Sequence, residues 1–95
     1  MAFVTSQAEP RNVTGTGAVS AGPCTFRGLS LRDTSGSANV VTLFDNASAA
    51  SGTVVATIAL AANGSGHVNA PDGLRCAAGL YLQAAGALVG SVWVG

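Results

Sequence analysis

The chain has 95 residues and a formal net charge of zero, and only 8% of its residues are charged, against about 25% in an average globular domain. It has no lysine, and its four positive charges are scattered arginines, so they form neither the basic stripe of a nucleic-acid-binding protein nor a polybasic membrane patch. The length predicts one domain, and a neutral surface favours association between protein chains.

The first ten residues differ in character from the rest. Phe3 and Val4 are followed by polar residues and a proline. We therefore predict an N-terminal arm over residues 1–10, which either lies across a neighbouring chain or frays, and a single domain over residues 11–95. The segment has neither the basic start nor the long apolar stretch of a secretory signal, so we do not expect export.

Short runs rich in Val, Thr, Leu and aromatic residues alternate with turn signals along the whole chain. In the first half they predict strands at about residues 11–20, 23–33 and 38–45. Within the second run, Phe26 has one parity and Leu29 and Leu31 have the other. Gly28 stands at the change of parity, where a β-bulge would restore a continuous inward face.

The second half of the chain predicts strands at about residues 53–61, 66–70, 73–77, 79–84 and 87–94. The first of these alternates, so that Val54, Ala56, Ile58 and Leu60 share one face. Between the last two, Ala84-Ala85-Gly86 predicts a three-residue hairpin loop with a positive φ at Gly86.

The last predicted hairpin is apolar on both faces, with leucines and Val92 on one face and Tyr81, Val89 and Trp93 on the other. The domain's second sheet covers one face, and the other needs a loop, the arm or another chain. If Tyr81 and Trp93 point outward, they could stack on a sugar or anchor in a partner subunit. Residues 76–95 carry no charge, but their four glycines and a period of two argue against a membrane-spanning helix.

Together these patterns predict an all-β fold. The expected architecture is a two-sheet antiparallel β-sandwich of about eight short strands, with a jelly roll as one arrangement of it.

Residues that could carry chemistry are few. The single histidine, His67, stands among turn residues, and no GxSxG, CxxC or HxxxH pattern occurs, so we expect no catalysis, metal or cofactor. Cys24 and Cys76 are expected to be reduced, unless their strands are neighbours and a disulfide forms. Asp33, Asp45 and Asp72 lie next to turns and are expected to cap backbone N–H groups. The segment Gly15-Thr16-Gly17 does not predict a dinucleotide-binding loop, because the third glycine and the following helix of that motif are missing.

Residues 22–95 resemble a recurrent type of small protein encoded by tailed bacteriophages. The resemblance is carried by Gly22-Pro23-Cys24, residues 28–38 (GLSLRDTSGSA), Val41-Thr42-Leu43-Phe44-Asp45, Gly79-Leu80-Tyr81-Leu82 and Val92-Trp93-Val94. Proteins of this type are generally thought to be virion components, including capsid decoration proteins and head or tail accessory proteins. The resemblance implies symmetric association without a cofactor, and it assigns no site residues.

Composition and resemblance together predict a structural virion protein that binds the outside of a phage capsid as a symmetric oligomer and stabilises it. Its expected partners are itself, as a homotrimer or other symmetric oligomer, and the major capsid protein, with no nucleic acid or membrane. It would be made in the host cytoplasm and end in the virion. Phe3, Val4, Tyr81 and Trp93 are the predicted contacts. The alternative is a carbohydrate-binding, host-binding or tail accessory module.

Overall fold

The computed structural model describes residues 8–95, which contain eight strands and no helix. The strands are β1 (Glu9–Val13), β2 (Gly17–Ser20), β3 (Cys24–Asp33), β4 (Asn39–Asp45), β5 (Thr53–Leu60), β6 (Ser65–Cys76), β7 (Leu80–Ala84) and β8 (Leu88–Val94). The all-β prediction is confirmed.

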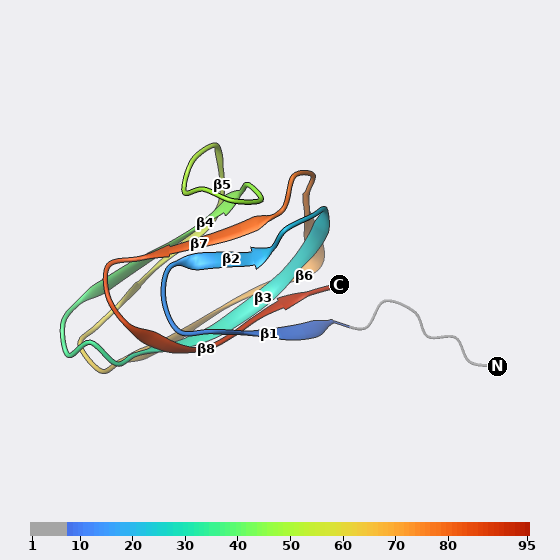
Figure 1. Cartoon of the computed structure of the whole chain (residues 1–95). Helices are drawn as coiled ribbons and strands as arrows, with labels where there is room; N and C mark the ends of the chain where they lie inside the picture. The colour runs from blue at the N-terminus through green and yellow to red at the C-terminus, as the bar shows by residue number, and fades with distance from the viewer. Residues whose placement is uncertain (1–7) are drawn as a thin grey trace.

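The strands form two antiparallel four-stranded sheets, β1-β8-β3-β6 and β2-β7-β4-β5, which pack face to face as a β-sandwich (Figure 1). Strand β1 pairs with β8, β2 with β7, β3 with β6 and β4 with β5. The chain is therefore folded back on itself and its two halves pair from end to end. This nested pairing, wrapped over two sheets, is the connectivity of a jelly roll.

Three strand boundaries differ from the prediction. The expected strand 11–20 is two strands, because the chain turns at residues 14–16 and passes from one sheet to the other. The expected strands 66–70 and 73–77 are one strand, β6, because residues 70–73 form a bulge rather than a turn, and pairing with β3 resumes beyond it. Strand β1 begins at Glu9, so Glu9 and Pro10 belong to the sheet rather than to the predicted arm.

The predicted hairpin between the last two strands is wrong. Strands β7 and β8 lie in different sheets, and residues 85–87 connect the sheets instead of forming a hairpin loop. Gly86 does not have a positive φ. The side chain of buried Asn39 holds this connection, because its Oδ1 accepts hydrogen bonds from the N–H groups of Ala85 (2.9 Å) and Gly86 (3.2 Å).

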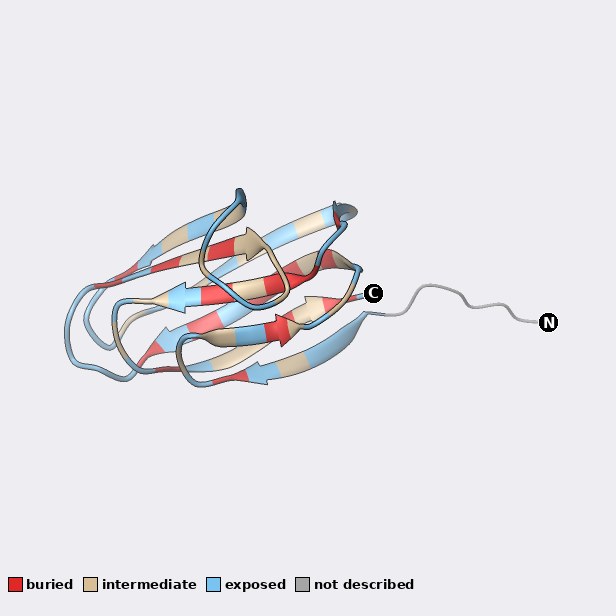
Figure 2. Cartoon of the chain, turned by 45° about the horizontal axis from the view of Figure 1, so that its top comes forward, coloured by how far each residue is buried: buried red, intermediate tan, exposed pale blue. Residues whose placement is uncertain are grey.

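The core lies between the sheets and consists of inward-facing aliphatic side chains, Phe26 and Cys76. Figure 2 shows the buried residues alternating with more exposed ones along the strands. The predicted bulge at Gly28 is confirmed, since the register of β3 shifts between Phe26 and Gly28 against both neighbouring strands. A second bulge, in β5, shifts the register between its pairs with Leu43 and Phe44. Ile58 and Leu60 share the core-facing side of β5, but the bulge turns Val54, which was predicted to lie on the same face, outward, where it is 53% exposed.

Candidate interaction faces

The outer face of the β2-β7-β4-β5 sheet is uncharged. Its pairing register places Ala18, Tyr81, Phe44 and Val54 in one row across all four strands. A second row joins Gln83, Thr42 and Thr57, and a third joins Val40 and Ala59. We call these nine residues the neutral face. Val40 is 56% exposed, and Tyr81 and Phe44 are half-buried.

Charge is distributed unequally between the two sheets. Of the eight charged side chains in the sequence, seven lie in the strands of the β1-β8-β3-β6 sheet, and Asp45 at the end of β4 is the remaining one. The neutral face can therefore be buried against another protein surface without desolvating a charge. A charged surface must offset the free-energy cost of desolvation by pairing its charges.

The structure places Tyr81 and Trp93 on opposite sides of the molecule. Both point outward, because their neighbours Leu80, Leu82 and Val92 are buried; the sequence alone leaves open which of the two faces is the outer one. However, Tyr81 lies in β7 and Trp93 in β8, so the crossing between sheets separates the expected aromatic pair. The other predicted contacts, Phe3 and Val4, lie outside the described residues.

Trp93 lies on the outer face of its sheet, where polar side chains occupy the next row. Pro10 and Gly28 are its direct cross-strand neighbours, and Asn69 follows beyond Gly28. The next row is Asn12, Ser91, Ser30 and His67. His67 is thus exposed on a sheet surface, opposite Ser30.

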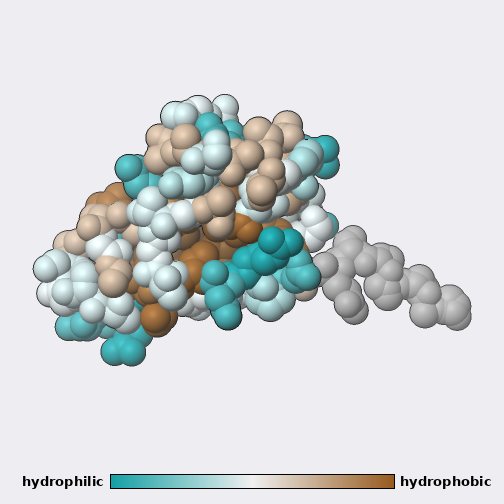
Figure 3. All heavy atoms as spheres, viewed as in Figure 1, coloured by the Kyte–Doolittle hydropathy of each residue, from teal (hydrophilic) through white to brown (hydrophobic). Residues whose placement is uncertain are grey.

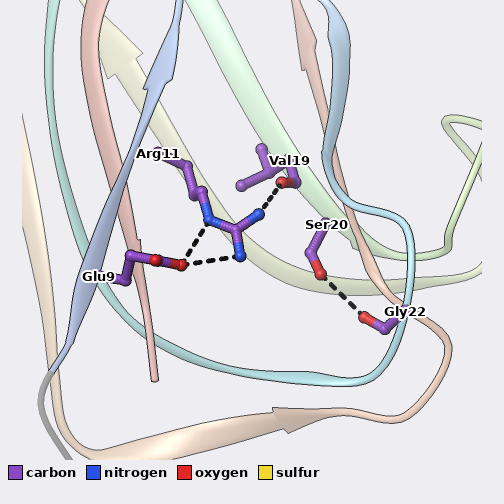
Figure 4. Close-up of polar contacts among 5 residues, drawn as sticks. All are labelled: Glu9, Arg11, Val19, Ser20 and Gly22. Atoms are coloured by element: carbon purple, nitrogen blue, oxygen red, sulfur yellow. Dashed lines mark hydrogen bonds and ion pairs between the residues drawn. The ribbon is translucent and has the colours of Figure 1, made fainter.

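Arg11 bridges the side of the sandwich where β1 and β2 are the edge strands. Its Nε donates to Oε1 of Glu9 (3.0 Å), its Nη2 lies 2.9 Å from the same oxygen, and its Nη1 donates to the carbonyl of Val19 (3.1 Å) (Figure 4). Figure 3 shows hydrophobic atoms in the hollow between the sheets on this side. Arg11 thus ties the two sheets together over an apolar interior.

Beside this bridge lies a cavity of about 350 Å³ that Glu9, Arg11, Ser20 and Cys24 help to line. Cys24 and Cys76 are direct cross-strand partners in β3 and β6, and both are free thiols. Burial, followed by the neighbouring Cys24, raises the pKa of the Cys76 thiol to about 11. The two cysteines are therefore neighbouring thiols at the end of one strand pair.

Two aspartates cap backbone groups, as predicted. Asp33 is fully buried and accepts hydrogen bonds from the N–H groups of Ser35, Gly36 and Asn63 and from the side chains of Ser35 and Asn39. The Ser35 hydroxyl bond and then the Asn63 N–H bond lower the pKa of Asp33 far below its usual value. Asp45 accepts from the N–H groups of residues 77–79, with Ala78 lowering its pKa most.

Among residues 8–95, no group of three or more His, Cys, Asp or Glu side chains is placed to hold a metal ion. The same residues form no helix that is long and apolar enough to cross a membrane.

Sequence reasoning missed Phe44 and Val40, which complete the neutral face. Their alternation with the buried Val41 and Leu43 was visible in the sequence. That alternation gives the face of one strand, but only the pairing of β4 with β7 places Phe44 beside Tyr81.

The chain matches no protein-family model, and neither the curated proteins nor the solved structures contain a significant match to it.

Proposed function

We propose that this protein is a non-enzymatic assembly module that buries its neutral face against neighbouring copies of itself in a symmetric oligomer. In the form suggested by the resemblance to phage proteins, the oligomer binds the outside of a capsid and stabilises it. The observation that carries the proposal is the segregation of charge, with seven of eight charged side chains in the opposite sheet.

The chemistry of the neutral face supports contact with a second copy. Tyr81 and Phe44 are direct cross-strand partners at the centre of a row that ends in exposed Val54. Aromatic residues are enriched at interface hot spots, and charged residues are depleted at interface centres. A face without charge can also be placed on its own copy without like-charge repulsion, as a symmetric contact requires.

Multivalency would then supply capsid affinity. A standard interface buries about 800 Å² on each partner, which is about one sixth of the 4849 Å² that residues 8–95 expose. One chain therefore has area both for contacts with neighbouring copies and for a separate contact with a capsid. Several weak contacts, presented together by one oligomer, would bind a symmetric capsid more tightly than any one of them.

The first test is the mass of the purified chain in solution, measured by sedimentation velocity for the wild type, Tyr81→Glu and Trp93→Phe. The proposal expects a defined oligomer for the wild type and for Trp93→Phe, and a shift toward monomer for Tyr81→Glu. The oligomer is then mixed with purified phage heads that lack it, and co-sedimentation is expected. A wild-type monomer that ignores the heads would contradict both parts of the proposal.

A further inference from the structure

Trp93 lies on the outer face of the β1-β8-β3-β6 sheet, and two opposite edges of its indole ring contact the sheet. On one edge of the indole, Nε1 donates a hydrogen bond to Oγ of Ser91 (2.9 Å). On the opposite edge, Cε3 and Cζ3 lie over Gly28, so close that a Cβ atom at Gly28 would come within 2.7 Å and 3.0 Å of them. Because both edges contact the sheet, one face of the ring packs on the backbone and the other is directed outward.

The space that holds the ring depends on glycine. Gly28 has a φ of 153°, which side chains rarely adopt, and it presents bare backbone where any other residue would carry a side chain. A ring over a bare glycine also stabilises a strand pair. That role uses only the inner face of the indole and leaves the outer face available.

Uncharged hydrogen-bonding groups lie beyond Gly28 and in the row next to the ring, and Arg27 precedes Gly28 in the bulge of β3. Asn69 lies across Gly28 in the same row, and Asn12, Ser30 and His67 lie in the next row, all of them exposed. Neighbouring strands are about 4.8 Å apart, and residues of one face are about 6.8 Å apart along a strand. Counted from the Trp93 position on these spacings, Asn12 and Ser30 lie about 8 Å away, Asn69 about 10 Å away and His67 about 12 Å away. A saccharide of two or more linked rings would therefore reach them from the indole.

We propose that this surface is a binding site for saccharides built from neutral pyranose rings. One side of a pyranose presents C–H bonds that pack against an aromatic face, and its rim carries hydroxyl groups. Trp93 would stack on the ring, while amide and hydroxyl groups of Asn12, Ser30 and Asn69 donate to and accept from the hydroxyls. This site goes beyond the proposed assembly function and does not depend on it, because it lies on the opposite outer face.

The test uses the intrinsic fluorescence of Trp93, which is the only tryptophan in the chain. Linear hexasaccharides of glucose, galactose and mannose are titrated into the purified protein. At least one of them is expected to change the emission saturably, with a Kd of about 1 mM or below, as is typical of a small exposed site. No saturable change with any of the three at about 20 mM would overturn the proposal.

A double variant, Ser30→Ala with Asn69→Ala, keeps the indole and the strand pairing and removes two hydrogen-bonding groups. Its Kd is expected to rise about tenfold, since each lost hydrogen bond weakens binding several-fold. Tyr81→Glu, on the neutral face, should leave the Kd unchanged even if it dissolves the oligomer. An unchanged Kd in the double variant would also overturn the site.

Discussion

A single buried carboxylate, that of Asp33, fixes two loops. Every group around it donates a hydrogen bond, from the backbone of residues 35, 36 and 63 and from the side chains of Ser35 and Asn39. An asparagine in its place would bring an amide donor into a shell of donors. We therefore expect Asp33→Asn to lower the melting temperature at pH 7, measured by circular dichroism, whereas Asp72→Asn, at an exposed position of β6, should change it little.

The same carboxylate makes stability depend on pH. The pKa of Asp33 is lower in the folded than in the unfolded chain, so its contribution is complete above the unfolded value of about 4 and is lost as the pH falls toward the folded value. Asp45 acts in the same direction. The melting temperature of the wild type should therefore fall more steeply below about pH 4 than that of Asp33→Asn. Parallel curves for the two proteins would contradict this linkage.

Gly28 is required by both conformation and space. A Cβ there would lie 2.7 Å from the carbonyl oxygen of Val68 as well as from the Trp93 ring, at a φ of 153°. Backbone strain and overpacking each cost about 1–3 kcal/mol, so we expect Gly28→Ala to lower the free energy of unfolding by at least about 2 kcal/mol in urea titrations. Gly15→Ala, where a Cβ meets nothing within 4 Å, is the matched control and should stay within about 0.5 kcal/mol.

At the scale of the strand, alternation in the sequence predicts which side chains share a face, and the change of parity in residues 23–33 predicts the β-bulge at Gly28. Alternation fails at Val54, because the bulge of β5 has no glycine to mark it. It also fails at residues 14–16 and 70–73, since a turn and a wide bulge contain the same residue types. Such a segment is a bulge if the chain pairs again with the same neighbouring strand beyond it, and a turn if it does not. The neighbouring strand is distant in sequence, so the local pattern cannot distinguish a turn from a bulge.

The connection between β7 and β8 shows the same limit. Ala84-Ala85-Gly86 has the composition of a hairpin loop, yet Asn39, more than forty residues away, binds its backbone and directs the chain to the other sheet. Alternation places Tyr81 and Trp93 on the faces opposite to Leu80 and Val92, but it does not decide which face points outward, because both faces are apolar. Their separation could not be predicted either, because it depends on this crossing.

The cysteine pair allows a test of the register between β3 and β6. Direct cross-strand partners lie about 4.5–5.5 Å apart at Cα, within the range that a disulfide spans. Treatment with diamide should remove both thiols, slowly at pH 7 because the raised pKa of Cys76 keeps it protonated. Closing so long a loop is expected to stabilise the fold by up to about 4 kcal/mol.

The oxidised protein should therefore melt at a higher temperature, and the effect should reverse on reduction. Cys24→Ser is the control and should show neither the thiol loss within the chain nor the shift. Disulfides that form only between chains would argue against the register.

At the scale of the whole molecule, the unequal distribution of charge determines how association responds to salt. At about 1 M NaCl the Debye length is about 3 Å, so contacts between charged surfaces weaken. Contact through the neutral face buries apolar and hydroxyl groups. Screening by salt does not weaken such a contact, and sulfate strengthens it. We therefore expect the oligomer to persist from about 0.05 M to 1 M NaCl in sedimentation velocity, and to be more stable in ammonium sulfate.

The direction of this response identifies the sheet that is buried. If the oligomer dissociates at high salt, the contact must involve the sheet that carries Arg11, Arg27, Arg32 and Arg75, and Tyr81→Glu should then leave the oligomer intact. If it persists at high salt and Tyr81→Glu dissociates it, the β2-β7-β4-β5 sheet is buried. The opposite sheet, with Trp93 and its polar neighbours, then remains on the outside of the assembly, where a saccharide can reach it.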